Sequence, residues 1–373
     1  MKTVRRLLYR DIVGAVSYVA LAFMSLFFFI DFVDELDDVG RQGYTAGHAA
    51  LHTLLLQPGH FYELVPIAVL IGTIYALSRM AQASEYTILR TGGLGPGRAL
   101  ALLATLGAIF ALLTFVVGDY MAPLSERQAV IVKARFSGGM KFGGAGAWLR
   151  DTPPPPTQTH TVNVNVAGTG PGGDLEGVRI FEFDADGRLL RRIAAEHGQV
   201  SHGGQEATWE LEQARISDWR SAGGATSGQV KHEQLGRLEW PSTLSANVVA
   251  AALLPVTTMT TVDLWRYTTH LADQEQAAQR YAIQFWKKAL YPMACLVMMA
   301  LALPFAYLHG RAGGVSLKVF GGIMLGISFV LLNNVAGHLG LLRNWTPWLT
   351  AAMPSAIYLL MSLGAFTWLV RNR

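Results

Sequence analysis

The sequence predicts a helical membrane protein of six transmembrane helices, three on each side of an inserted antiparallel β-domain of jellyroll or sandwich type. Two observations predict this fold class. The region from Asp119 to Lys288 is polar and rich in glycine. On both sides of it lie long stretches with almost no formal charge, at 12–30, 42–78, 99–118, 289–308, 319–342 and 344–370. A helix of about 20 apolar residues crosses the hydrocarbon of a bilayer, where each backbone amide must bond within its own segment.

The positions of the basic residues predict which side of the membrane each loop faces. Lys and Arg gather at both termini, at 79–98 and at 311–318, whereas 31–38 is acidic. Positively charged loops stay in the cytoplasm. We therefore expect a bacterial inner-membrane protein with both termini cytoplasmic and the β-domain periplasmic. The net charge of +4 does not indicate nucleic acid, because the basic residues mark loop ends and form no continuous patch.

The N-terminal membrane half is expected to cover 1–136. Its first helix is expected at 10–36, and the third helix is expected to continue outward from 99–118 through 121–136. Between the second and third helices, 84–91 (SEYTILRT) is expected to form two helical turns along the inner surface.

The second apolar stretch, 42–78, is too long for one crossing. Pro58 and Gly59 fall inside it, and proline removes a helical hydrogen bond. We therefore expect a surface helix at 45–57, followed by a separate crossing at 61–82.

The β-domain is expected at 137–262. It begins with a glycine-rich segment at 137–146 and four prolines at 153–156. Apolar and polar residues then alternate in 177–183, 188–200 and 207–219, which is the period of antiparallel strands. A helix-prone segment from Thr261 to Lys288 leads into the C-terminal membrane half, 263–373.

Short motifs that accompany catalysis are missing from the sequence. It has no GxxxxGK[ST] phosphate loop, no HExxH zinc motif, no paired CxxC and no GxSxG elbow. His197 and His202 alone supply too few ligands for a metal. Cys295 is the only cysteine, so no disulfide within the chain holds the outer domain. We expect a non-enzymatic chain with no metal site and no cofactor of its own.

Polar residues in four places are candidates for function. The first place is 84–91, which is either a docking helix for a cytoplasmic partner or an ordinary polar loop. A docking helix would offer apolar contacts from Ile88 and Leu89 and a charge-assisted contact from Glu85. The residues assigned to this contact are Ser84, Glu85, Tyr86, Ile88, Leu89 and Arg90.

The second place is the outer end of the first helix. Asp31, Asp34, Glu35 and Asp38 recur at helical spacing and share one face. Their mutual repulsion requires an offset from a partner's Lys or Arg, a divalent cation or water. A solvated helix end is the simpler interpretation.

The third and fourth places lie near the membrane. Arg127, Lys133 and Arg135 follow the third helix, where they either meet lipid phosphates or anchor the helix among the headgroups. Asn333 and Asn334 lie in the fifth helix, where they either face a wet cavity or bond to another helix.

The strand at 177–183 carries apolar residues on both faces. Phe181 and Phe183 lie on the face opposite Val178 and Ile180. Such a strand is covered on both sides, or it lines an apolar trough on one of them. Ile180, Phe181 and Phe183 are therefore candidates for a lipid-holding groove, with a sealed core as the alternative.

Several short segments are distinctive when they are taken in order. They are FVDEL at 32–36, LLLQP at 54–58, SEYTILRTGG at 84–93, YMAP at 120–123, GAWLRD at 146–151, the entry to the fourth helix from Gln284 and the tail LVRNR. Together they resemble the LptF/LptG family of lipopolysaccharide-export permeases over nearly the whole chain. FVDEL and GAWLRD favour the LptG branch.

The resemblance implies a function and a set of partners. A family member pairs with a second permease, here of LptF type, on a cytoplasmic ATPase dimer of LptB type that uses the ATP and Mg²⁺. Lipopolysaccharide leaves the inner membrane through a lateral gate between the permeases. It then passes to a periplasmic jellyroll bridge that includes an LptC-type bitopic protein and leads to the outer membrane.

The resemblance also implies roles for particular residues. Segment 84–91 would be the coupling helix, with Glu85 against the ATPase, and the first helix with Asp34 would line the gate together with the fifth helix. One departure concerns the lysines that LptG proteins often carry at the outer end of the first helix, where this chain has Asp31, Asp37 and Asp38. Lys133 and Arg135 match the basic extension of the third helix better, and carboxylates reach phosphates through divalent cations.

The sequence therefore predicts an LptG-type permease subunit. The main alternative is a membrane-anchored scaffold whose β-domain binds a periplasmic protein without transport. A polar cavity among the helices would favour transport, and tightly sealed helices would favour the scaffold. An intramembrane enzyme is a weaker alternative, because Glu63 is the only acid in the second to sixth apolar stretches.

Overall fold

The structure is a computed structural model in which two compact units are described separately. One unit comprises Met1–Asp37, Ala49–Arg127 and Val256–Arg373, and the other comprises Asp38–His48 and Gln128–Pro255. The described residues are 2–41, 43–136, 140–141, 147–151, 161–169, 174–184, 186–203, 206–219, 230–242, 244, 259–270, 275–307 and 314–371. Most of the glycine-rich segment 137–146 and all of the prolines 153–156 lie outside this set.

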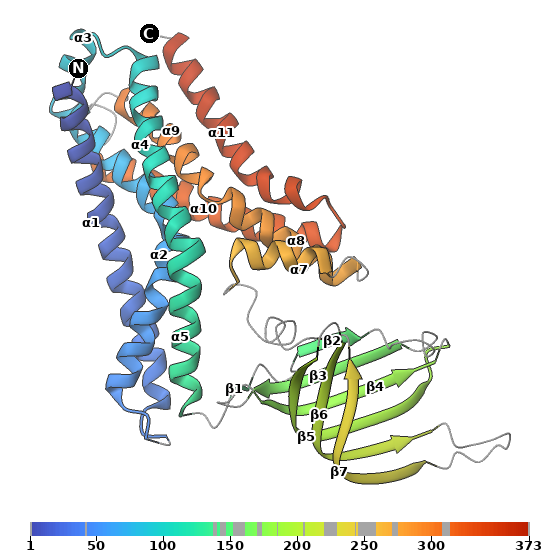
Figure 1. The fold of residues 1–373 in the computed structure, drawn as a ribbon. Coiled ribbons are helices and arrows are strands. Elements are labelled where there is room, and N and C mark those ends of the chain that lie inside the picture. The colour runs from blue at the N-terminus through green and yellow to red at the C-terminus, as the bar shows by residue number, and fades with distance from the viewer. Residues whose placement is uncertain are drawn as a thin grey trace. The chain divides into compact units, whose positions relative to one another are not determined.

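The first unit is built from helices (Figure 1). In chain order they are α1 (Lys2–Glu35), α2 (Ala46–Gln82), α3 (Glu85–Thr91), α4 (Pro96–Val116), α7 (Thr261–His270), α8 (Glu275–Leu290), α9 (Met293–Tyr307), α10 (Val315–Leu342) and α11 (Pro347–Arg371). A 3₁₀ turn, Leu36–Asp38, follows α1. A π-helical turn, Val117–Met121, joins α4 to α5 (Ala122–Ala134), so the third helix does extend as expected.

Five helical runs in the described part of the chain are long and apolar enough to cross a membrane. A sixth crossing results if α8 and α9 act as one broken span, since they meet at a 51° bend around Tyr291 and Pro292. The predicted arrangement of apolar helices flanking a β-domain is confirmed. The short helix expected at 84–91 is present as α3.

The predicted break of the second apolar stretch at Pro58 and Gly59 was wrong. α2 runs without interruption from Ala46 to Gln82 and carries Pro58 and Pro66 inside it. A proline removes one hydrogen bond, and neighbouring side chains in a helix bundle make up for the loss. The Gln57 amide donates to the Thr53 carbonyl at 3.4 Å, within the turn that Pro58 disturbs.

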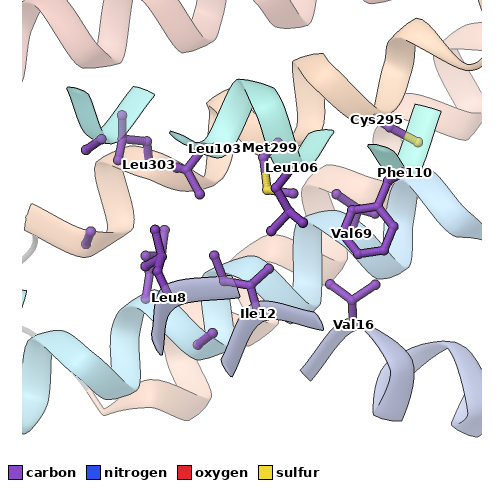
Figure 2. Packing of buried hydrophobic residues seen from close by; sticks show 14 of the residues in the cluster. Leu8, Ile12, Val16, Val69, Leu103, Leu106, Phe110, Cys295, Met299 and Leu303 are labelled. Carbon is purple, nitrogen blue, oxygen red and sulfur yellow. The ribbon is translucent and has the colours of Figure 1, made fainter. Parts of the chain in front are cut away.

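Helices α2 and α9 form the centre of this unit. Side chains of α1, α2, α4 and α9 point into one apolar cluster, which Figure 2 shows around Ile12, Val69, Leu106 and Met299. A second cluster joins α2 and α9 to Phe329 of α10 and Tyr358 of α11.

Glycines bring the backbones at these crossings close together. A Cβ placed on Gly72 of α2 would lie 2.6 Å from the Cα and the amide nitrogen of Val16 in α1. One placed on Gly326 of α10 would lie 2.8 Å from a methyl carbon of Ile67. Small residues allow this approach, and the resulting van der Waals packing holds helices together in lipid.

The second unit contains one antiparallel sheet of seven strands. The strands are β1 (Met140–Lys141), β2 (Ala147–Asp151), β3 (Thr161–Thr169), β4 (Leu175–Phe183), β5 (Leu189–Gly203), β6 (Glu206–Asp218) and β7 (Lys231–Ser242). The order is β1-β3-β4-β5-β6-β7, and β2 also pairs with β3. Of the expected forms, the described strands make an open, single-sheet one, which curves as Figure 1 shows.

One face of the sheet covers an apolar core. Val164 of β3, Ile180 of β4, Ile193 of β5 and Trp209 of β6 are almost completely buried there. The indole N–H of Trp209 donates to the Leu244 carbonyl at 3.0 Å, so the chain after β7 is tied to the core. Alternating positions face away from the core, as the sequence period predicts.

The Gly72 crossing yields a stability prediction. Gly72→Ala should destabilise the folded chain by about 1–3 kcal/mol, because the new methyl group overlaps the α1 backbone and a backbone yields little. Gly14→Ala on α1 is the matched control, since nothing lies within 4 Å of a Cβ at that position. Thermal unfolding of the detergent-purified chain would measure both variants, and equal midpoints would contradict a close crossing at Gly72.

Candidate functional site

A cavity of about 590 Å³ lies among the helices of the first unit. Its walls come from α1, α2, the α4–α5 connection, α7, α8 and α10. Apolar side chains such as Phe27, Ile67 and Phe329 line part of it. The cavity is therefore partly apolar and is bounded in part by helices that are long and apolar enough to cross a membrane.

Charged and amide side chains line the rest of the cavity. Glu63, Glu126, Lys287 and Lys288 contribute charge, and Asn333 and Asn334 contribute amides. The Lys287 ammonium group lies against Gly337 of α10, where any side chain would collide with it. The Tyr291 hydroxyl, at the α8–α9 bend, donates to the Glu63 carbonyl at 2.5 Å.

Beside this cavity, hydrogen bonds and one ion pair join the α4–α5 helix, and separately α8, to the beginning of α7. The Thr261 amide donates to Asp119 at 2.7 Å, and the Arg127 guanidinium lies 3.2 Å from the Asp263 carboxylate. The Lys288 ammonium donates to the Met259 carbonyl at 2.6 Å. The helix that ends the N-terminal half is thus joined to the helices that begin the C-terminal half.

The start of α7 is determined locally by a reciprocal cap. The Thr260 hydroxyl accepts from the Asp263 amide at 3.1 Å, while the Asp263 carboxylate accepts from the Thr260 amide at 3.3 Å. This is the Thr-x-x-acid pattern of a capping box. Asp263 therefore both caps α7 and pairs with Arg127.

At the acidic end of α1, the chain's own basic residues offset part of the negative charge. Within the first unit, Asp31 lies 2.7 Å from His60. Within the second unit, Asp38 lies 2.7 Å from Arg41 and 3.1 Å from Lys133. Lys133 is thus engaged with an acid.

The side chains of two other candidate residues, Asp34 in the first unit and Arg135 in the second, are exposed.

Helix α3 presents one face to the helices and another away from them. Tyr86 is buried, with its ring edge-on to Tyr307 at 5.3 Å between centroids. The Arg90 guanidinium lies over the Tyr307 ring at 5.7 Å. Burial, followed by the nearby Tyr307 hydroxyl, raises the pKa of Tyr86, so this phenol stays neutral.

The other face of α3 is open. Glu85 is exposed, Ile88 is 67% exposed, and Leu89 is half-buried against the apolar cluster. Ser84, just before the helix, adopts a left-handed conformation with φ of 61°. An acid and an apolar side chain are therefore available at the surface of α3.

In β4 the two faces differ in burial. Ile180 lies in the core, whereas Phe181 and Phe183 are half-buried on the opposite face. Phe181 stacks on Trp148 of β2 at 5.6 Å, and the Arg192 guanidinium lies over its ring at 5.8 Å. The lipid groove stays a prediction.

Sequence reasoning singled out Asn333 and Asn334 but not Glu126, Lys287 and Lys288, which line the same cavity. In the sequence, Lys287 and Lys288 end the helix-prone segment that starts at Thr261, and Glu126 lies in the extension of the third helix. A local signal existed at 260–263, where the capping box places an acid at the start of α7. The spatial meeting of α5, α7 and α8 has no signature in a single sequence.

The helices, the cavity and the inserted sheet define a multi-pass membrane protein of transporter type. More particularly, the chain belongs to the LptF/LptG family, since the family model "Lipopolysaccharide export system permease LptF/LptG" matches residues 6–370. It is 26% identical to the lipopolysaccharide export system permease protein LptG of Escherichia coli K12, over 94% of this chain and 92% of that protein. It is 24% identical to LptG of Haemophilus influenzae, over 97% of each chain.

Two substitutions separate the roles of Asp263. Asp263→Asn keeps a side-chain acceptor for the cap and removes the charge that meets Arg127, whereas Asp263→Ala removes both. We expect Asp263→Ala to lower stability by about 1 kcal/mol more than Asp263→Asn, which is the scale of one helix cap. Thermal unfolding of both purified variants would measure the difference. Equal losses would mean that the cap contributes nothing and that the ion pair accounts for the effect.

Proposed function

We propose that this chain is the LptG-type permease subunit of an ATP-driven exporter that extracts lipopolysaccharide from the inner membrane. The match to the family over residues 6–370 carries this proposal. In it, the chain pairs with an LptF-type permease, and a lateral gate between them admits lipid from the outer leaflet. The termini lie in the cytoplasm, and the β-domain lies in the periplasm.

The central cavity supports transport over a scaffold without transport. Its apolar wall suits acyl chains, and Lys287 and Lys288 suit the phosphates of a lipid headgroup. A helix bundle that served only as an anchor would need no such space. In the proposal, Asp31 and Asp34 of α1 and Asn333 and Asn334 of α10 line the gate, while Arg127, Lys133 and Arg135 meet headgroup phosphates.

Extraction requires an external energy source. Exposing acyl chains to water costs about 0.8 kcal/mol for each CH₂ group, so several chains do not leave a bilayer spontaneously. This chain has no phosphate-binding loop. In the proposal, an LptB-type ATPase dimer binds ATP and Mg²⁺, and this subunit binds no cofactor.

Helix α3 is the proposed contact with that ATPase. Glu85 and Ile88 face outward, while Tyr86 and Arg90 hold the helix against Tyr307 at the end of α9. In the proposal, a movement of α3 is thereby transmitted to α9, the central helix of the C-terminal half. Lipid would then leave through the β-domain to an LptC-type protein and a periplasmic jellyroll bridge.

The docking of α3 can be tested by charge reversal. Glu85→Arg should reduce lipopolysaccharide transport at least tenfold and uncouple it from hydrolysis, because a buried charge pair in the contact becomes repulsive. Transport and ATPase rates of the reconstituted complex would be compared with Glu85→Gln, which removes charge without reversing it. Normal complex yield together with normal transport in Glu85→Arg would refute the docking contact.

Lipid passage through the β-domain can be tested by photo-crosslinking at 178, 180, 181 and 183 during ATP-driven export. We expect lipid adducts at 181 and 183 only, since Phe181 and Phe183 are partly open while Val178 and Ile180 are packed inside the core. The same crosslinking reaction without ATP serves as the control. If none of the four positions gives an adduct, β4 only packs the domain.

A further inference from the structure

A second cavity, of about 460 Å³, lies beside α3 in the first unit. Its walls come from the beginning of α1, from the end of α3 with the turn that follows, and from the first turns of α4. Figure 1 shows these three segments together at one end of the helices. It shares no lining residue with the central cavity, so it is a separate site.

Two arginines line this cavity. Arg5 comes from α1 and Arg98 from α4, and both side chains are exposed. Arg98 donates to the Gly93 carbonyl at 3.3 Å, which uses one of its five N–H groups. Among the ion pairs of the described residues, neither guanidinium has a carboxylate partner, in contrast to Arg79, which lies 3.0 Å from Asp11.

The remaining wall is largely apolar, and a hydrogen bond joins two of the helices that form it. Val4, Leu89 and Leu102 line the cavity with Thr105. The Tyr9 hydroxyl donates to the Leu102 carbonyl at 3.0 Å and ties α1 to α4. Arg98 stands next to the uncharged stretch 99–118, so the cavity passes from charged to apolar along α4. This is the pattern of a membrane helix at the boundary between headgroups and acyl chains.

We propose that this cavity binds an anionic glycerophospholipid, with its phosphate on Arg5 and Arg98 and an acyl chain along Leu102 and Thr105. Basic pockets between transmembrane helices hold the headgroups of such lipids. A free phosphate ion would make no use of the apolar wall, and a zwitterionic lipid would bring a second positive charge, that of its own headgroup, beside the two guanidinium groups. The bound lipid would also contact Leu89 and Leu94, at the end of α3 and just after it.

The experiment measures lipid retention by the full-length chain, purified in detergent and mixed with phosphatidylglycerol or phosphatidylcholine, by native mass spectrometry. The wild type should retain phosphatidylglycerol in preference to phosphatidylcholine. Arg5→Gln combined with Arg98→Gln should weaken retention of phosphatidylglycerol about thirtyfold, from the loss of two cationic contacts at a membrane surface. Arg6→Gln is the matched control, since Arg6 is an exposed neighbour that does not line the cavity.

A second variant separates a cavity from a charged surface. Thr105→Trp keeps both arginines and fills the apolar part, so it too should reduce retention of phosphatidylglycerol. Undiminished retention in either Thr105→Trp or the double arginine variant would overturn the proposal, as would equal retention of the two lipids by the wild type. Unfolding midpoints would confirm that each variant is folded. The measurement needs neither ATP nor lipopolysaccharide, so its outcome is independent of the proposed export function.

Discussion

The close approach of helices to α2 is the constraint on which the membrane unit depends. Lipid tails are as apolar as leucine, so burial of apolar surface provides no net attraction between helices in a membrane. Backbone proximity supplies it here: Gly72 admits α1, while Gly322 and Gly326 of α10 admit Ile74 and Ile67 of α2. Because α2 also packs on α9, a change of packing at one of these crossings alters the packing of helices from both halves of the chain.

This central packing explains where the cavity and the charges are found. From Val65 to Met80, the stretch that includes these crossings, most residues of α2 are buried. Around Gly59 and Glu63 the neighbouring helices leave space. Charge enters that space from α5 and α8. The contacts of Asp119, Arg127 and Lys288 join the α4–α5 helix and α8 each to the start of α7. At the other end, Tyr86 and Tyr307 join α3 to α9. The structure thus has a continuous packed route from α3, through α9 and α2, to helices that line the cavity.

Two features show where sequence reasoning reached its limit. Pro58 predicted a helix break because an isolated helix loses a hydrogen bond there, yet α2 continues through it. The acidic end of α1 indicated that its mutual repulsion needs an offset but did not show what supplies it. His60 is 29 residues from its partner Asp31, and Lys133 lies on a different helix from Asp38. Each outcome depends on neighbours distant in sequence, which a local pattern does not contain.

The sequence by itself determined the apolar helices, the antiparallel strands, the short helix α3 and the family, because these follow from length, periodicity and ordered segments of the chain. It also identified Asn333 and Asn334, since amides are rare at membrane depth. Only the tertiary structure decided that these amides share a cavity with Lys287, Lys288 and Glu126, and that Arg5 and Arg98 line a second one. The physical reason is that a cavity is a property of several helices packed together, and charges from separate helices become one site only when packing brings them within a few ångströms of each other.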